Sequence, residues 1–155
     1  MIKRKILILL TGLLLWPAIL FSQTAILDSI KVTPLDPKVN VSTLYRLSFV
    51  VTDTIPTDAQ FALNFPDGFD LSQVTLAGSK TMNGGFKVTV AGQEVLIQRQ
   101  GEGATIYPDK KVNLLYSTVK NPDTSNANYL LQIWIMDGRG NSLTNVQTSS
   151  FAITP

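Results

Sequence analysis

Large apolar side chains alternate with polar ones along most of the chain after residue 25, and this period of two is typical of half-buried β-strands. The pattern is clearest in residues 44–51, where every second side chain from Tyr45 to Val51 is large and apolar. Clusters of Pro, Gly, Asn and Asp separate the apolar runs, and these residues favour turns. The expected strands are residues 26–33, 44–51, 61–65, 74–76, 86–90, 95–97, 112–119, 129–136 and 150–154.

The number and spacing of these runs indicate the fold class. No apolar stripe with the period of a helix is long enough to compete with them, which also argues against parallel α/β folds. Two runs of similar length flank the turn sequence Ala91-Gly92-Gln93, so we expect residues 85–99 to form one hairpin. The sequence therefore predicts an all-β domain, an antiparallel β-sandwich of about 8–9 strands.

The segment 129–136 is apolar on both of its faces, and only Gln132 interrupts it. A strand of this kind normally lies inside its sheet and is covered on both sides. We expect Ile133 and Ile135 in the core between the sheets. The other face, which carries Trp134, is either covered by loops or meets something outside the domain.

Residues 1–25 have the three-part layout of a secretory signal peptide. Residues 3–5 are Lys-Arg-Lys, residues 6–15 are almost entirely apolar, and residues 22–25 supply small side chains for cleavage, which we expect after Thr24 or Ala25. An uncleaved anchor is the alternative, but the apolar stretch 6–21 contains Pro17 and is shorter than the roughly 20 residues a spanning helix needs. We therefore predict that residues 26–155 form the exported domain, secreted, at the cell surface or in the periplasm, with membrane contact only during export.

Charge and composition narrow the function. Cleavage removes three of the 13 basic residues and none of the 11 acidic ones, which leaves a net charge of −1 and argues against nucleic acid as a partner. The sequence has no His and no Cys, so imidazole and thiol catalysis and the usual zinc ligands are missing. We predict a protein that is not an enzyme and binds no cofactor or metal.

Carboxylates are the one remaining source of acid–base chemistry. A glycosidase needs two carboxyl groups about 5–10 Å apart, and the candidates are Asp67, Asp70, Glu94 and Glu102. Both aspartates lie in a turn sequence with Pro and Gly, where Asp is expected for turn formation. We expect turn-forming and solubilising roles for this set.

Calcium, which binds to oxygen ligands, is the one metal ion for which the sequence offers a candidate site. Residues 137–141 read Asp-Gly-Arg-Gly-Asn, and Asp123 is expected at the same end of the sandwich. Calcium prefers about 6–8 oxygen ligands with several carboxylates, and Arg139 stands in the middle of this loop. We therefore expect a simple hairpin loop at residues 137–141.

Exposed aromatic rings would indicate a ligand surface. Trp134 is the only tryptophan after residue 25, and with Tyr129 and Tyr116 it forms the candidate set. Rings along one sheet face suit stacking on sugars. The alternative is that Trp134 belongs to the core, as a lone tryptophan in an apolar strand of a sandwich commonly does.

The turn and strand motifs also carry a resemblance. Residues 30–34 read Ile-Lys-Val-Thr-Pro, residues 45–49 Tyr-x-Leu-x-Phe, residues 65–69 Phe-Pro-Asp-Gly-Phe and residues 119–122 Val-Lys-Asn-Pro. This VTP…FPxGF…NP order resembles the immunoglobulin-like β-sandwich module repeated in bacterial and archaeal cell-surface proteins, over nearly all of residues 26–155. The resemblance implies an immunoglobulin-like sandwich in a structural or adhesive setting, and it brings no catalytic residues and no partner.

The leading hypothesis is an exported, non-catalytic structural or adhesion module that acts through surface contacts with a protein or glycan at the cell surface. The alternative is a carbohydrate-binding module with an aromatic platform around Trp134, and a carboxylate-dependent hydrolase is a distant third. Residues 151–155, Phe-Ala-Ile-Thr-Pro, echo residues 30–34 and would open a further domain in a tandem array. We expect instead that they form the last strand of this domain.

Overall fold

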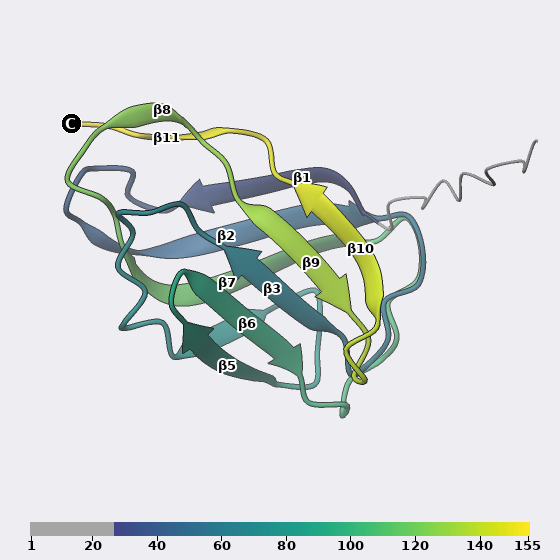
Figure 1. Cartoon of the computed structure of the whole chain (residues 1–155). Coiled ribbons are helices and arrows are strands. Elements are labelled where there is room, and N and C mark those ends of the chain that lie inside the picture. The colour runs from purple at the N-terminus through teal and green to yellow at the C-terminus, as the bar shows by residue number, and fades with distance from the viewer. Residues whose placement is uncertain (1–26) are drawn as a thin grey trace, which may run out of the picture.

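Two antiparallel sheets pack face to face in the computed structural model, which describes residues 27–155 (Figure 1). The four-stranded sheet has the order β1-β2-β7-β4, the five-stranded sheet has the order β10-β9-β3-β6-β5, and β11 pairs with β8 in a small third sheet. The predicted all-β sandwich is confirmed, with eleven strands in the described part of the chain. They are β1 Leu27–Pro34, β2 Ser42–Val51, β3 Gln60–Asn64, β4 Leu76–Ser79, β5 Phe86–Ala91, β6 Glu94–Arg99, β7 Lys111–Lys120, β8 Asn126–Tyr129, β9 Gln132–Met136, β10 Ser142–Gln147 and β11 Phe151–Ile153.

The predicted hairpin in residues 85–99 is present. β5 and β6 pair in register from Phe86 with Arg99 to Ala91 with Glu94. Gly92 begins the turn between them with a φ of 58°, a left-handed value that glycine adopts without steric cost. The turn residues therefore fix the register, as the sequence pattern indicated.

Two strands differ from the prediction. The apolar segment 129–136 divides at Leu130 and Leu131, so that β8 pairs with β11 while β9 joins the five-stranded sheet. β10 was not predicted, because its sequence Ser-Leu-Thr-Asn-Val-Gln has few apolar residues. β10 is an edge strand that pairs with β9 alone, and Thr144 is the only one of its six residues that is buried.

The core lies between the two main sheets, and strand alternation predicts its members well. In β2 the side chains of Tyr45, Leu47 and Phe49 are at most 1% exposed. Ile133 and Ile135 of β9 are fully buried in the same cluster, so their predicted place in the core is confirmed. The apolar alternation of the sequence is thus the alternation between core and outer face.

A buried tyrosine joins the core to the loops at one end of the sandwich. The hydroxyl of Tyr45 donates a hydrogen bond to Oδ1 of Asn121 at 2.5 Å. The Asn121 amide nitrogen donates in turn to the carbonyl oxygens of Asp36 at 3.0 Å and Lys38 at 2.7 Å. Burial raises the pKa of Tyr45 well above its usual range, so this donor keeps its proton. Asn121, the asparagine of the late Asn-Pro turn, therefore holds the loop between β1 and β2 against the end of β7.

Residues 1–26 lie outside the described part of the chain, and with them the predicted signal peptide. Within residues 27–155 there is no helix that is long and apolar enough to span a membrane.

The Tyr45 hydrogen bond can be tested against a matched control. Tyr116 is also buried in the core, but its hydroxyl has no hydrogen-bond partner in the described structure. We expect Tyr45→Phe to lower the free energy of unfolding by about 1–3 kcal/mol, because it leaves Oδ1 of Asn121 without its donor. Tyr116→Phe should be neutral or stabilising. Urea denaturation of both variants measures the difference, and equal losses would contradict the role given to Asn121.

Candidate functional site

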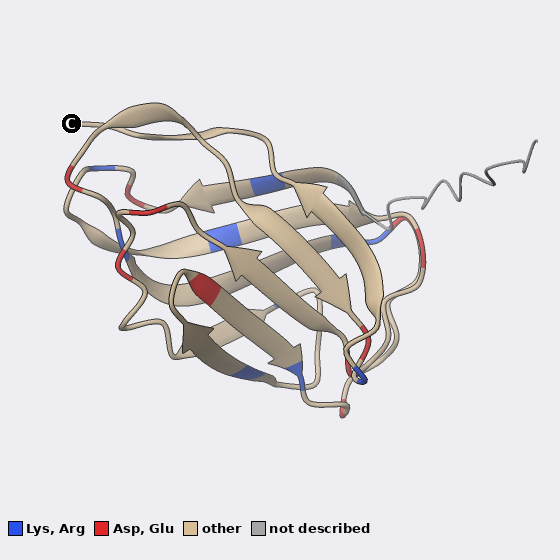
Figure 2. Cartoon of the chain, in the orientation of Figure 1, with Lys and Arg blue, Asp and Glu red and all other residues tan. Residues whose placement is uncertain are grey.

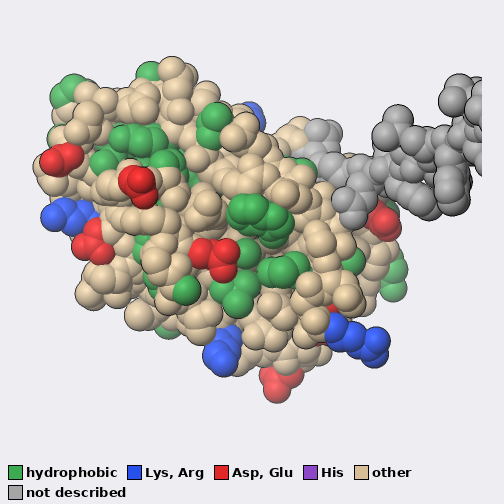
Figure 3. Space-filling view, in the orientation of Figure 1, with side chains coloured by type: hydrophobic (Ala, Val, Ile, Leu, Met, Phe, Trp, Pro, Cys, Tyr) green, Lys and Arg blue, Asp and Glu red, His purple; other side chains and the backbone are tan. Residues whose placement is uncertain are grey.

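Trp134 lies on the outer face of the five-stranded sheet. It stands opposite Asn145 of β10 on one side and Ala62 of β3 on the other, and Leu96 of β6 follows next to Ala62. The space-filling view of this face shows hydrophobic side chains gathered over its middle strands, with an acidic side chain beside them (Figure 3). We call the outward-facing side chains of β10, β9, β3, β6 and β5 the Trp134 face.

The packing of Ala62 shows how Trp134 is placed. Ala62 points away from the core and yet is only 3% exposed. Its two cross-strand neighbours on the same face are Trp134 and Leu96, both half-buried, and these larger side chains cover it. Trp134 therefore lies on the outer side of the five-stranded sheet and not in the core. Part of its indole packs on the sheet, and the rest is accessible.

Neutral polar side chains surround this apolar centre. The charges on the face are those of Glu94 on β6 and Lys87 on β5. A side-chain hydrogen bond from Gln132 to Asn145 lies beside Trp134. The remaining amides of the face are Gln60, Asn64, Gln98 and Gln147. Such a face offers apolar area together with neutral donors and acceptors, which suits contact with a polar, uncharged partner.

The structure does not bring the three predicted aromatic residues together. Tyr116 is 1% exposed and faces the core from β7, so it cannot contact a ligand at the surface. Its place follows the same alternation as Val112 and Leu114, a signal that the sequence already contained. Tyr129 lies on β8, where its ring packs 5.0 Å from that of Phe69 and its hydroxyl donates to the carbonyl oxygen of Thr124 at 3.2 Å. Trp134 alone of the three belongs to the face.

The candidate carboxylates were Asp67, Asp70, Glu94 and Glu102, and Asp70 has a hydrogen-bond partner within its own turn. Oδ1 of Asp70 accepts the backbone N–H of Ser72 at 2.9 Å, and this bond lowers the pKa of Asp70. A general acid requires a raised pKa. Glu94 stands on the Trp134 face, while Asp67 precedes Gly68, whose φ of 96° marks a turn. This arrangement supports the turn-forming role expected of the two aspartates.

The loop 137–141 closes the hairpin between β9 and β10. Oδ1 of Asp137 accepts the backbone N–H groups of Arg139 at 2.9 Å and Asn141 at 2.8 Å, and Oδ2 accepts the Asn141 amide at 2.8 Å. These hydrogen bonds, with those to Asn141 largest, lower the pKa of Asp137. Both carboxylate oxygens therefore serve the turn, as the hairpin reading expected. Within residues 27–155 no group of three acidic side chains is arranged to hold a metal ion.

The expectation that Asp123 lies near this loop is wrong. Asp123 follows Lys120, the last residue of β7, which pairs with Ser42 at the start of β2. Asp137 follows Met136, which pairs with Gln60 at the start of β3. β2 runs the length of the sandwich, and β3 begins at the end where β2 finishes (Figure 1). The start of β2, near Asp123, and the start of β3, near Asp137, therefore lie at opposite ends of the sandwich.

A buried arginine was not among the predicted residues. Arg99 is 1% exposed, and its guanidinium donates to the carbonyl oxygens of Pro56 at 2.6 Å, Ala104 at 2.7 Å and Asn83 at 3.3 Å. Burial lowers the pKa of this guanidinium, and the nearby charge of Asp58 opposes the shift. Arg99 ties three loops together at its end of the sandwich. Its inward position on β6 follows the period of Val95 and Ile97, which the sequence displayed.

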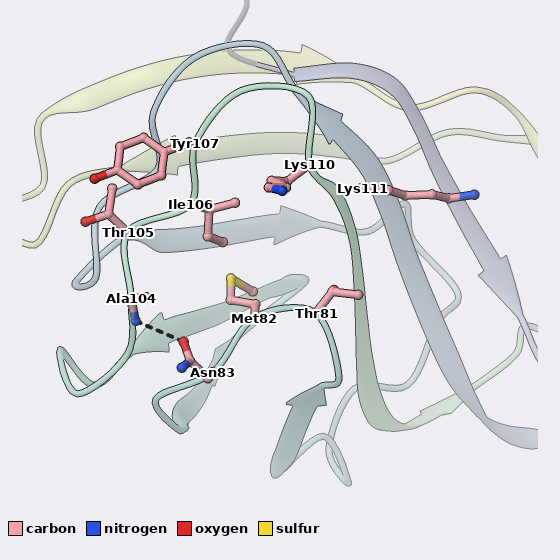
Figure 4. Close-up of a pocket in the computed structure, with 9 residues that line it drawn as sticks. All are labelled: Thr81, Met82, Asn83, Ala104, Thr105, Ile106, Tyr107, Lys110 and Lys111. Atoms are coloured by element: carbon pink, nitrogen blue, oxygen red, sulfur yellow. Dashed lines mark hydrogen bonds between the residues drawn. The ribbon is translucent and has the colours of Figure 1, made fainter.

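A pocket of about 360 Å³ adjoins these loops (Figure 4). Met82 and Ile106 form its buried apolar base, and Oδ1 of Asn83 accepts the backbone N–H of Ala104 at 2.9 Å. Tyr107, at the rim, is 64% exposed and turns its hydroxyl outwards. The charged residues in its lining are Lys110 and Lys111, and no carboxylate lines it. The pocket therefore lacks the pair of carboxylates that a glycosidase uses.

Comparison with known proteins concerns the fold. No protein-family model matches the chain, and a search of curated proteins found no match. Among solved structures, the full-length major pilin SpaD of Corynebacterium diphtheriae aligns with a TM-score of 0.51 at 15% identity, over 80% of this chain and 33% of the pilin. A non-cellulosomal cohesin of Archaeoglobus fulgidus gives 0.48 at 16% identity, over 82% of this chain and 91% of the cohesin. The fold is an immunoglobulin-like β-sandwich.

The placement of Trp134 predicts a contrast with its neighbour in β9. Trp134→Ala removes a half-buried side chain, so we expect it to cost about 1–2 kcal/mol of unfolding free energy. Ile133→Ala opens a cavity in the core and should cost about 2–5 kcal/mol. Thermal and urea denaturation of the two variants provide the measurement. A larger loss for Trp134→Ala than for Ile133→Ala would place the indole in the core after all.

Proposed function

We propose that this protein is an exported, non-catalytic structural or adhesion module that acts through surface contacts, with the Trp134 face as its contact surface. The observation that carries the proposal is the half-buried indole of Trp134, set beside Leu96 on a flat sheet face with little charge. Interfaces are enriched in aromatic side chains and depleted of charged ones at their centre. The expected partner is a protein or a glycan at the cell surface.

The chemistry of the described side chains supports contact rather than catalysis. The carboxylates of Asp70 and Asp137 accept hydrogen bonds from their own turns. The tyrosines Tyr45 and Tyr116 are buried, and burial raises the pKa of each. The likeness to a pilin, which concerns the fold, is compatible with a structural module outside the cell.

A carbohydrate-binding module is the second candidate, and the amides around Trp134 favour it. Asn145 stands directly opposite the indole, and Gln132 lies beside that pair. Amide groups hydrogen-bond sugar hydroxyls, and an indole presents a flat apolar surface to a sugar ring. With Tyr116 in the core, the platform consists of one ring, which limits the stacking area.

Export is tested by processing of the full chain. The basic residues 3–5, the apolar run and the small residues 22–25 predict cleavage by a signal peptidase. The exported protein should begin between Gln23 and Ile26 when its N-terminus is sequenced. An intact Met1 on exported, membrane-bound protein would contradict this part of the proposal.

The contact surface is tested on beads that carry the exported protein. We expect such beads to adhere to the cells that produce the protein and Trp134→Ala to reduce the adhesion by about tenfold, the scale of a centrally placed aromatic side chain. Tyr107→Ala is the matched control, because Tyr107 is an exposed aromatic residue outside the Trp134 face. Adhesion that both variants retain, or lose equally, would contradict the assignment.

Pretreatment of the cells separates the two candidate functions. Protease treatment should abolish adhesion if the partner is a protein, whereas periodate oxidation should abolish it if the partner is a glycan. Retention on a polysaccharide column that is lost in Trp134→Ala would select the carbohydrate-binding module.

A further inference from the structure

The outer face of the four-stranded sheet carries a groove on the side opposite the Trp134 face. A hollow of about 700 Å³ lies between Arg46 of β2 and the segment 78–81, with Leu115 of β7 in its lining. A second hollow of about 280 Å³ shares Gly78 and Leu115 with it and extends towards Leu44 and Leu76. The two hollows therefore form one continuous groove along β7.

The groove exposes aliphatic side chains. Leu76 is 69% exposed and Leu44 is 40% exposed, while Leu115 between them is half-buried. Gly78 leaves a gap beside Leu115, because a Cβ atom placed there would meet no atom within 4 Å. Exposed leucines around such a gap are apolar area that a partner could remove from water.

The charge of the groove has one sign. Arg46 lines it from β2, Lys80 lines it directly after β4, and Lys111 faces outwards at the start of β7. The sequences of β2, β4 and β7 contain no acidic residue. Basic segments mark β1, β2 and β7 in Figure 2, while most acidic ones lie in the loops. The groove is therefore basic, although the chain after residue 25 has more acidic than basic residues.

Aromatic rings are missing from the outward positions of β2, β4 and β7. The aromatic residues of these strands, Tyr45, Phe49 and Tyr116, all face the core and are at most 1% exposed. A sugar ring would find no stacking surface there. Aliphatic side chains next to cations fit instead a polypeptide that carries aliphatic residues and carboxylates. β2 and β4 are separated by β7 alone, two strand spacings or roughly 10 Å, which is room for one segment of chain.

We propose that this groove binds an acidic, aliphatic segment of another protein. Its leucine-type side chains pack against Leu76, Leu115 and the gap at Gly78, and its carboxylates face Arg46 and Lys80. This contact lies on the opposite sheet from the Trp134 face. It gives the module a second partner surface, and its failure would leave the proposal for the Trp134 face untouched.

The test uses a labelled random copolymer of glutamate and leucine, which assumes no particular spacing. We expect fluorescence anisotropy to show binding to the exported protein that weakens as salt is added. Polyglutamate, which lacks aliphatic groups, and a lysine–leucine copolymer, which has the opposite charge, should bind at least about tenfold more weakly. Heparin is the anionic glycan probe, and binding as tight as that of the glutamate–leucine copolymer would overturn the choice of a peptide.

The variants exploit the space at Gly78. Gly78→Glu fills the gap and adds a negative charge without a steric clash, so it should keep the melting temperature and weaken copolymer binding by about tenfold. Ser125→Glu adds the same charge at an exposed position of the loop before β8, outside the groove and the Trp134 face, and should bind as the original protein does. Arg46→Gln should weaken binding and reduce its salt dependence.

Three results would overturn the proposal. The first is a lack of copolymer binding by the original protein. The second is equal binding by Gly78→Glu and Ser125→Glu. The third is self-association in analytical ultracentrifugation that Gly78→Glu abolishes, because the occupant would then be a second copy of this chain.

Discussion

The hydrogen bond between Tyr45 and Asn121 is the contact on which one end of the structure depends. The sequence has no cysteine, so no disulfide can hold the loop between β1 and β2. That loop is tied instead to the side chain of Asn121, which reaches its backbone at two carbonyls while accepting from Tyr45. Tyr45 also packs its ring 5.8 Å from that of Phe65 and 6.0 Å from that of Phe151. One side chain thus links the aromatic core to the chain's late turn.

Strand alternation was sufficient to predict most of the interior, because the core selects large apolar side chains at every second position. It placed Leu47, Phe49 and Ile133 correctly, and the same rule would have placed Tyr116 and Arg99 inside. The same alternation puts Trp134 on the face opposite Ile133, but it does not tell whether that face is covered, because both faces of this strand are apolar. The small side chain of Ala62 lets the indole pack part of its surface against the sheet there.

The remaining differences come from tertiary contacts that a local pattern does not contain. β10 is recognisable only through its pairing with β9. The segment 129–136 is divided because its first residue belongs to β8, which pairs with β11. The separation of Asp123 from Asp137 depends on strand direction, which the sequence leaves open. The groove beside Gly78 required the order of the four-stranded sheet, which brings β2, β7 and β4 together from distant parts of the chain.

The way the chain enters and leaves the sandwich has a mechanical consequence. Leu27 pairs with Val51 at one end of β2, whereas Thr154 is hydrogen-bonded to Pro37 and Val39 beside the other end of that strand (Figure 1). A force that pulls these two ends apart acts along the strands. Such a force shears the β1–β2 ladder and the short β8–β11 ladder, so that the hydrogen bonds of each ladder share the load and do not open one by one. Forced unfolding is governed by the unfolding rate, so we expect this shared loading to slow unfolding under tension along the strands.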